Sequence, residues 1–163
     1  MGRPVTFACL MAAVLAFTGE VSAQSLEIKR LNPSEWTKGR FSEIITVNGP
    51  GKTIYLAGVA AEDEATPAGV LAAAKHAGNP LEQCRYAYDK IKRLLASQGA
   101  SLADVVKQVV YVTDIRYLPA YGQCRTEAYK GVGAFPVNTF LVVSALAHET
   151  MLIEIDVTAV VGK

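Results

Sequence analysis

The chain has 163 residues, of which 51% are hydrophobic and 19% are charged, and its formal net charge is +1. This composition predicts one globular domain with a sizeable core and excludes an intrinsically disordered chain. A net charge so close to zero, without a clustered basic run, favours neither nucleic acid nor a charged membrane surface as a partner.

The N-terminal segment has the pattern of a secretory signal. Arg3 supplies a short positive region, residues 7–17 form an unbroken apolar run, and a Val-Ser-Ala cleavage site follows. The apolar run is too short for a transmembrane helix, which needs about 20 residues, so we expect no stable membrane anchor. The pattern predicts a cleaved signal peptide over residues 1–23, a mature domain over residues 24–163, and a periplasmic or secreted location.

The cysteines allow two interpretations. Cys9 leaves with the signal, and Cys84 and Cys124 remain as an even pair in an oxidising compartment, where a disulfide is possible. Cysteine is also among the most buried residue types, and we favour two buried, unpaired thiols. No CxxC or Cys/His spacing indicates a metal site, and we expect neither a metal nor another cofactor.

The sequence predicts strands and a long loop in the first half of the mature chain. Residues 26–31 alternate apolar and charged side chains, which predicts a short strand. Two β-rich runs, at residues 42–47 and 53–58, flank an Asn-Gly turn and predict a hairpin. Residues 60–80 predict a long surface loop with at most one helical turn. Loops of this length often act as lids, although the acidic cluster at residues 62–64 is more typical of a solvated loop.

The second half contains the helices. Apolar side chains three and four residues apart predict a helix over residues 81–98, capped by Asn79 and ended by Gly99. A capped turn and a strand over residues 105–113 follow, and Asp114 can cap a second helix over residues 117–130. Two further strands, residues 138–144 and 151–160, complete the prediction.

The last strand indicates how the layers pack. Its aliphatic row should lie under the helices, whereas Glu154 and Asp156 point to the opposite face. This arrangement suits a two-layer α+β domain with both helices on one face of the sheet. The other face is half apolar, and an exposed patch of this kind usually marks an interface, so we expect an oligomer.

Three segments together resemble the Rid family, also called YjgF. They are GRFSEIITVNG with TIYLAGVA, LLASQGASLADVVKQVVYVTDIRYLPAY, and FPVNTF with MLIEIDVTAV, and the likeness extends from about Gly39 to Val160. The resemblance implies a chorismate-mutase-like α+β fold with a mixed sheet, and a homotrimer whose sheets line a barrel. It also implies a small-molecule cleft at each subunit interface, and hydrolysis of reactive enamines and imines without a metal or cofactor.

The resemblance also assigns roles to residues. Glu154 matches the catalytic glutamate that holds the attacking water. Asn138, Phe41, Gly58 and Val137 fall at or beside the substrate-binding positions. Two of them depart from the family pattern, because Asn138 stands where the family has a carboxylate-binding arginine, and Phe41 where it has a tyrosine.

The missing arginine bears directly on the substrate. Arginine binds a carboxylate through two parallel charged hydrogen bonds, which asparagine cannot form. We therefore expect poor turnover of 2-imino acids, with some activity restored by Asn138→Arg. Three functions remain open: a Rid-type deaminase with divergent or reduced 2-imino acid activity, a non-catalytic trimer that binds a small ligand in the same cleft, and a structural or chaperone-like protein.

Overall fold

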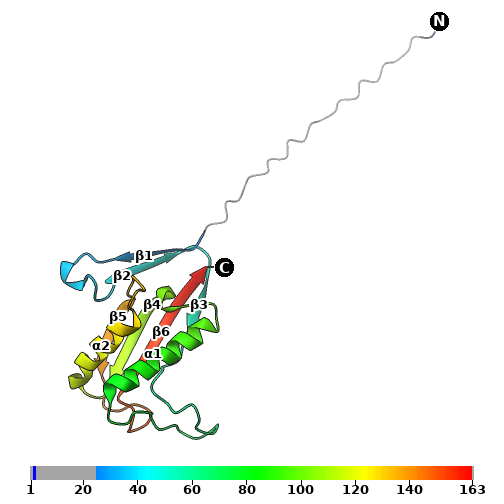
Figure 1. The fold of residues 1–163 in the computed structure, drawn as a ribbon. Helices are drawn as coiled ribbons and strands as arrows, with labels where there is room; N and C mark the ends of the chain where they lie inside the picture. The colour runs from blue at the N-terminus through cyan, green and yellow to red at the C-terminus, as the bar shows by residue number, and fades with distance from the viewer. Residues whose placement is uncertain (1, 3–24, 163) are drawn as a thin grey trace.

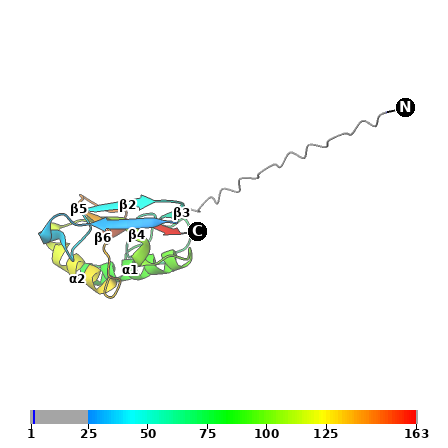
Figure 2. The same cartoon turned by 90° about the horizontal axis from the view of Figure 1, so that it is seen from above.

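The computed structural model describes residues 2 and 25–162. Apart from Gly2, the segment predicted as a signal peptide lies outside the described residues, so that interpretation stays a prediction. Two helices cover one face of a sheet (Figure 1), and a view turned by 90° shows both helices on the same side of the strands (Figure 2). The α+β architecture with two helices on one sheet face is confirmed.

The strands form two sheets. The larger has the order β3-β6-β4-β5, in which only β4 and β5 run parallel, so the sheet is mixed as expected. Its strands are β3 (Gly51–Tyr55), β4 (Val105–Val112), β5 (Val137–Val142) and β6 (Ile153–Gly162). The smaller sheet pairs β1 (Glu27–Leu31) with β2 (Ile44–Asn48) in antiparallel fashion, and it lies at one end of the larger sheet (Figure 1).

The predicted hairpin is wrong. The two runs that flank the Asn-Gly turn are strands, but β2 pairs with β1 whereas β3 pairs with β6. Pro50 between them has no N–H to donate to a ladder. Gly49 has φ +88°, and a Cβ at this position would collide with the backbone oxygen of Ser25. The chain therefore turns a corner here and passes from one sheet to the other.

The helices lie close to their predicted positions. Helix α1 spans Pro80–Ala96, and the Asn79 side chain accepts a hydrogen bond of 3.2 Å from the Glu82 N–H, as a helix cap does. Helix α2 spans Leu118–Ala128. Asp114 does not cap α2 itself, because a 3₁₀ turn over Ile115–Tyr117 comes first and the Asp114 side chain accepts a hydrogen bond from the Arg116 N–H of that turn. Two further 3₁₀ turns span Glu35–Thr37 and Leu102–Asp104.

The core lies between the helices and the larger sheet. Ile153, Ile155 and Val157 of β6 are buried there with Tyr88 and Leu95 of α1, which confirms the predicted aliphatic row. Within residues 25–162, no helix has the length and apolar character needed to span a bilayer.

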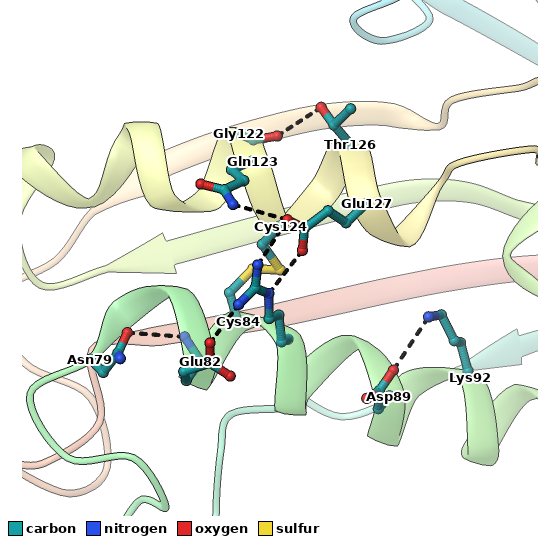
Figure 3. Close-up of polar contacts among 11 residues, drawn as sticks. Asn79, Glu82, Cys84, Asp89, Lys92, Gly122, Gln123, Cys124, Thr126 and Glu127 are labelled. Atoms are coloured by element: carbon teal, nitrogen blue, oxygen red, sulfur yellow. Dashed lines mark hydrogen bonds and ion pairs between the residues drawn. A yellow bond between two sulfur atoms is a disulfide. The ribbon is translucent and has the colours of Figure 1, made fainter.

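The two helices are joined by a disulfide between Cys84 of α1 and Cys124 of α2 (Figure 3). The favoured interpretation of two unpaired thiols is therefore wrong. Cys84 belongs to the apolar stripe of α1, and this stripe meets α2 as well as the sheet, so the two Cα atoms lie 6.1 Å apart. An ion pair crosses the same helix boundary, from the Arg85 Nε to the Glu127 Oε2 at 2.8 Å.

The long loop between β3 and α1 contains no helix in residues 60–79 and is fastened to α1. The Glu62 carboxylate pairs with the Lys90 ammonium at 3.0 Å, and the Glu64 carboxylate pairs with the Arg93 guanidinium at 2.7 Å. The acidic cluster is therefore not simply a solvated part of the loop, because two of its carboxylates dock the loop onto the helix.

Candidate functional site

The Glu154 carboxylate lies against Gly58, near the start of the central strand β6. Val59 and Ile155 exchange two backbone hydrogen bonds of 2.9 Å, which holds the segment after β3 alongside β6. A Cβ at Gly58 would meet the Glu154 carboxylate, at 2.7 Å from its Cδ. Only glycine leaves room for the carboxylate in this position.

Several causes make the Glu154 carboxyl easier to protonate. Burial has the largest effect and raises its pKa, and the nearby Glu62 and Asp156 carboxylates raise it further. No residue within 25–162 donates a hydrogen bond to this carboxylate. A carboxyl with a raised pKa and free lone pairs has the properties of a general base or acid.

Glu62 connects the long loop to this carboxylate. Its Oε1 accepts a hydrogen bond of 3.2 Å from the Ala60 N–H, and its Oε2 pairs with Lys90. The side chains of Lys90 and Glu62 are only 19% and 25% exposed, so salt screens the attraction in this pair less than in an ordinary surface ion pair. Lys90 holds the Glu62 carboxylate close to Glu154, and the ion pair fixes the loop at the edge of the candidate site.

Asn138 belongs to a different environment. Its Oδ1 accepts hydrogen bonds from the Gln108 Nε2 at 2.7 Å and from the Tyr121 hydroxyl at 2.8 Å. Gln108 is fully buried, and its Oε1 also accepts from the hydroxyls of Tyr88 and Tyr129. Asn138 is therefore part of a polar cluster beneath the helices.

The strand register places the two predicted site residues on opposite faces of the sheet. Asn138 lies opposite Gln108 in β4, on the helix-covered face. Glu154 lies opposite Tyr111, on the face without helices. Within one chain the structure therefore does not bring Asn138 and Glu154 together.

Phe41 and Val137 lie elsewhere. Phe41 lines a cavity between the smaller sheet and the segment that precedes β5, together with Phe135. Val137 is half-buried and shares the helix-free face with Glu154. Through Lys107 of β4, however, it is aligned across the sheet with Thr158 of β6 rather than with Glu154.

Comparisons with known proteins agree with this fold. The family model described as endoribonuclease L-PSP, Ribonuc_L-PSP, matches residues 33–161. The chain belongs to the Rid/YjgF family.

Solved structures, two of them of Rid/YjgF proteins, are similar to this chain over most of its length. A protein of the conserved Rid family from Yersinia pestis, YyfB, is 27% identical, with a TM-score of 0.65 over 82% of this chain and 98% of its own. A member of the YjgF/YER057c/UK114 family from Mycobacterium tuberculosis is 26% identical, with a TM-score of 0.55 over 83% of this chain and 100% of its own. A protein of unknown function from Pseudomonas aeruginosa is 28% identical, with a TM-score of 0.55, and the match covers 82% and 92% of the two chains.

Of the residues predicted for the site of this Rid chain, Gly58 and Glu154 meet, whereas Asn138, Phe41 and Val137 lie apart from them. Glu62 and Lys90 were not predicted from the sequence as neighbours of the site. The acidic cluster was the only signal for Glu62, and no spacing rule connects it to Lys90, 28 residues further along the chain.

Proposed function

We propose that this Rid/YjgF protein hydrolyses small imines or enamines that lack a carboxylate, with Glu154 as the catalytic residue. The observation that carries the proposal is the Glu154 carboxylate, which lies against Gly58 with a pKa raised by burial. The family relationship also supports Glu154 as the catalytic residue, because Glu154 lies within the residues that match the family model.

The proposed reaction needs only water and one carboxylate. Glu154 in its ionised form accepts a proton from water, and the oxygen forms a bond to the imine carbon. The C=N nitrogen takes up this proton from Glu154 and then a second proton from the newly formed hydroxyl group, and it leaves as ammonia when the C–N bond breaks and the C=O bond forms. An imine and water thus become a carbonyl compound and ammonia. The raised pKa makes Glu154 a stronger base than an ordinary glutamate.

The environment of Asn138 supports a substrate without a carboxylate. The Oδ1 of Asn138 is already engaged by Gln108 and Tyr121 on the helix-covered face. A neutral amide held in this way offers no charge to a carboxylate. An arginine at position 138 would have to displace this polar cluster, so Asn138→Arg tests the cluster as much as the substrate preference.

We expect Glu154→Gln to lower the rate of imine hydrolysis by about 100-fold or more, because glutamine cannot accept the proton from water. An amine oxidase acting on a primary amine releases the imine, and its decay is followed by competition with semicarbazide. The rate of the wild type should fall at acid pH as Glu154 becomes protonated. Since burial raises its pKa, this loss should occur at higher pH than for an ordinary glutamate.

Asp156→Asn is the matched control, because Asp156 lies on the same strand and face and loses the same charge. It should retain most of the activity. Equal rates for the wild type and Glu154→Gln would contradict the proposal. An inert wild type that still binds imine analogues would favour the alternative, a non-catalytic ligand-binding protein.

We further propose that the protein is a homotrimer, with a small-molecule cleft between subunits. The helix-free face of the larger sheet exposes Tyr55 and Leu141, which are 77% and 43% accessible, and exposed apolar side chains on an open sheet usually mark an interface. Light scattering on the mature protein should give about three chain masses, a closed cyclic arrangement. A monodisperse monomer would refute this assembly.

The proposed location is periplasmic or secreted. The disulfide between Cys84 and Cys124 supports it, because such bonds persist in oxidising compartments. Intact-mass measurement on the native protein should give a chain that begins at Gln24. An RNA substrate, despite the name of the family model, is not favoured by a net charge of +1.

A further inference from the structure

The Asn48-Gly49 dipeptide lies at the corner where the chain passes from the smaller sheet to the larger. Asn48 is the last residue of β2 and is exposed, and Gly49 has φ +88°. The dipeptide does not form the predicted hairpin. Within residues 25–162, no hydrogen bond engages the Asn48 side chain or the Gly49 N–H. Both groups are therefore accessible to water and to each other.

These two groups can react with each other. The Gly49 nitrogen loses its proton and bonds to the Asn48 Cγ, while the side-chain NH₂ takes up a proton and leaves as ammonia. Glycine favours this step, because it has no Cβ to hinder the approach of its nitrogen. Water then adds its oxygen to either carbonyl carbon of the cyclic imide, and the C–N bond at that carbon breaks. The nitrogen regains a proton, a carboxylate forms, and the product is aspartate or isoaspartate.

The other asparagines of the chain are protected from this reaction. Asn32 and Asn79 each precede a proline, whose nitrogen carries no proton to lose. Asn138 lies within β5, and its Oδ1 accepts hydrogen bonds of 2.7 and 2.8 Å. The residue after it, Thr139, is β-branched and hinders its own nitrogen. Asn48 is therefore the asparagine at which the reaction is expected.

The reaction would place a new negative charge opposite Glu27. Glu27 of β1 is the cross-strand partner of Asn48, and the Cβ atoms of such partners lie about 4.5–5.5 Å apart. Lys29 pairs with Glu27 at 3.2 Å, but both side chains are more than half exposed, so salt weakens this compensation. Like charges on directly opposed residues destabilise an antiparallel pair, so either product weakens the pairing of β1 with β2.

Isoaspartate would also lengthen the backbone at a place without room for it. Its chain runs through the former side chain and so contains one more backbone atom. A Cβ at Gly49 would collide with the backbone oxygen of Ser25, and a Cβ at Gly51 would lie 3.0 Å from the backbone oxygen of Val161. Because the corner is closely packed on both sides, the longer chain has to displace the end of β2.

We propose that Asn48 is a site of self-modification, at which the chain converts its own asparagine to isoaspartate and thereby loosens the smaller sheet. The inference goes beyond the proposed hydrolysis and does not depend on it. The reaction consumes only water, and it uses neither the Glu154 carboxylate nor a substrate.

Peptide mapping by mass spectrometry tests the proposal on the mature protein, held in a mildly alkaline buffer made with heavy-oxygen water. Asn48 should convert about tenfold or more faster than Asn138, which corresponds to an activation free energy lower by about 1.4 kcal/mol. Its new carboxylate should carry a heavy oxygen, and fragmentation of the peptide should identify isoaspartate. Asn48→Gln is the matched control, because glutamine has to close a larger ring and should keep its amide.

Hydrogen exchange measures the structural consequence in the same samples. Protection of the β1 and β2 amides should fall as Asn48 converts, whereas protection of the β6 amides should persist. Freshly prepared Asn48→Asp carries the charge without the extra backbone atom, so it should lose less protection than the isoaspartate form.

Glu154→Gln should convert at Asn48 at the same rate as the wild type, which separates this reaction from the proposed hydrolysis. An Asn48 that keeps its amide while a urea-denatured sample of the same chain converts would show that the fold protects it, and would overturn the proposal. Unchanged protection of β1 and β2 after conversion would overturn it as well.

Discussion

Gly58→Ala is expected to lower the rate of imine hydrolysis by about 100-fold while the free energy of unfolding changes by no more than about 1 kcal/mol. The added Cβ would occupy the place of the Glu154 carboxylate. Because this carboxylate is the end of a flexible side chain, it can rotate away at little cost. The rotation moves the proton acceptor out of position, and a displacement of about 1 Å can cost a hundredfold in rate. Steady-state kinetics together with chemical denaturation measure the two effects.

Gly122→Ala provides the matched control. A Cβ at Gly122 in α2 meets no atom within 4 Å, so the substitution should leave the rate unchanged and should stabilise the helix by about 0.5–1 kcal/mol. If Gly58→Ala retained full activity, the position of the Glu154 carboxylate against Gly58 would not be the one in which it acts.

Breaking the Cys84–Cys124 disulfide should lower the free energy of unfolding by about 2–4 kcal/mol. The bond closes a loop between residues 40 positions apart in the sequence, and releasing it gives the unfolded chain more conformational freedom. Urea denaturation of the wild type with and without dithiothreitol measures the loss.

The double variant Cys84→Ala with Cys124→Ala is the control for the reductant. It should be destabilised even without dithiothreitol, and dithiothreitol should have no further effect on it. Its loss should be somewhat larger than that of the reduced wild type, because two buried sulfur atoms are also removed. Equal midpoints for the oxidised and reduced wild type would show that the bond contributes nothing to stability.

Local patterns predicted the elements of this fold well, because each depends on neighbouring residues. The apolar stripe of α1 and the alternation in β6 both describe one face of one element, and both are confirmed. The hairpin failed for the opposite reason. The turn around Gly49 and Pro50 is real, but the partner of β3 is β6, at the other end of the chain, and no local pattern encodes that choice.

The candidate site was predictable only in part for a related reason. Family likeness located Glu154 and Gly58, and their contact follows from the pairing of Val59 with Ile155. The face on which Asn138 lies depends on its register with Gln108 in the parallel neighbour β4. A shift by one residue would reverse that face, so the position of Asn138 in the sequence did not determine its environment. The disulfide likewise depends on how α1 packs on α2.

The position of β6 has a consequence for the order in which the protein folds during synthesis. This strand lies between β3 and β4, yet it is the last to be made, and Gly51 must wait for Gly162 to pair. Pairings between such distant residues form slowly, and here they cannot begin until β6 has left the ribosome. A nascent chain that stops before Ile153 has two strands without their common neighbour. The larger sheet is therefore completed only when Ile153–Gly162 can join the strands made before it.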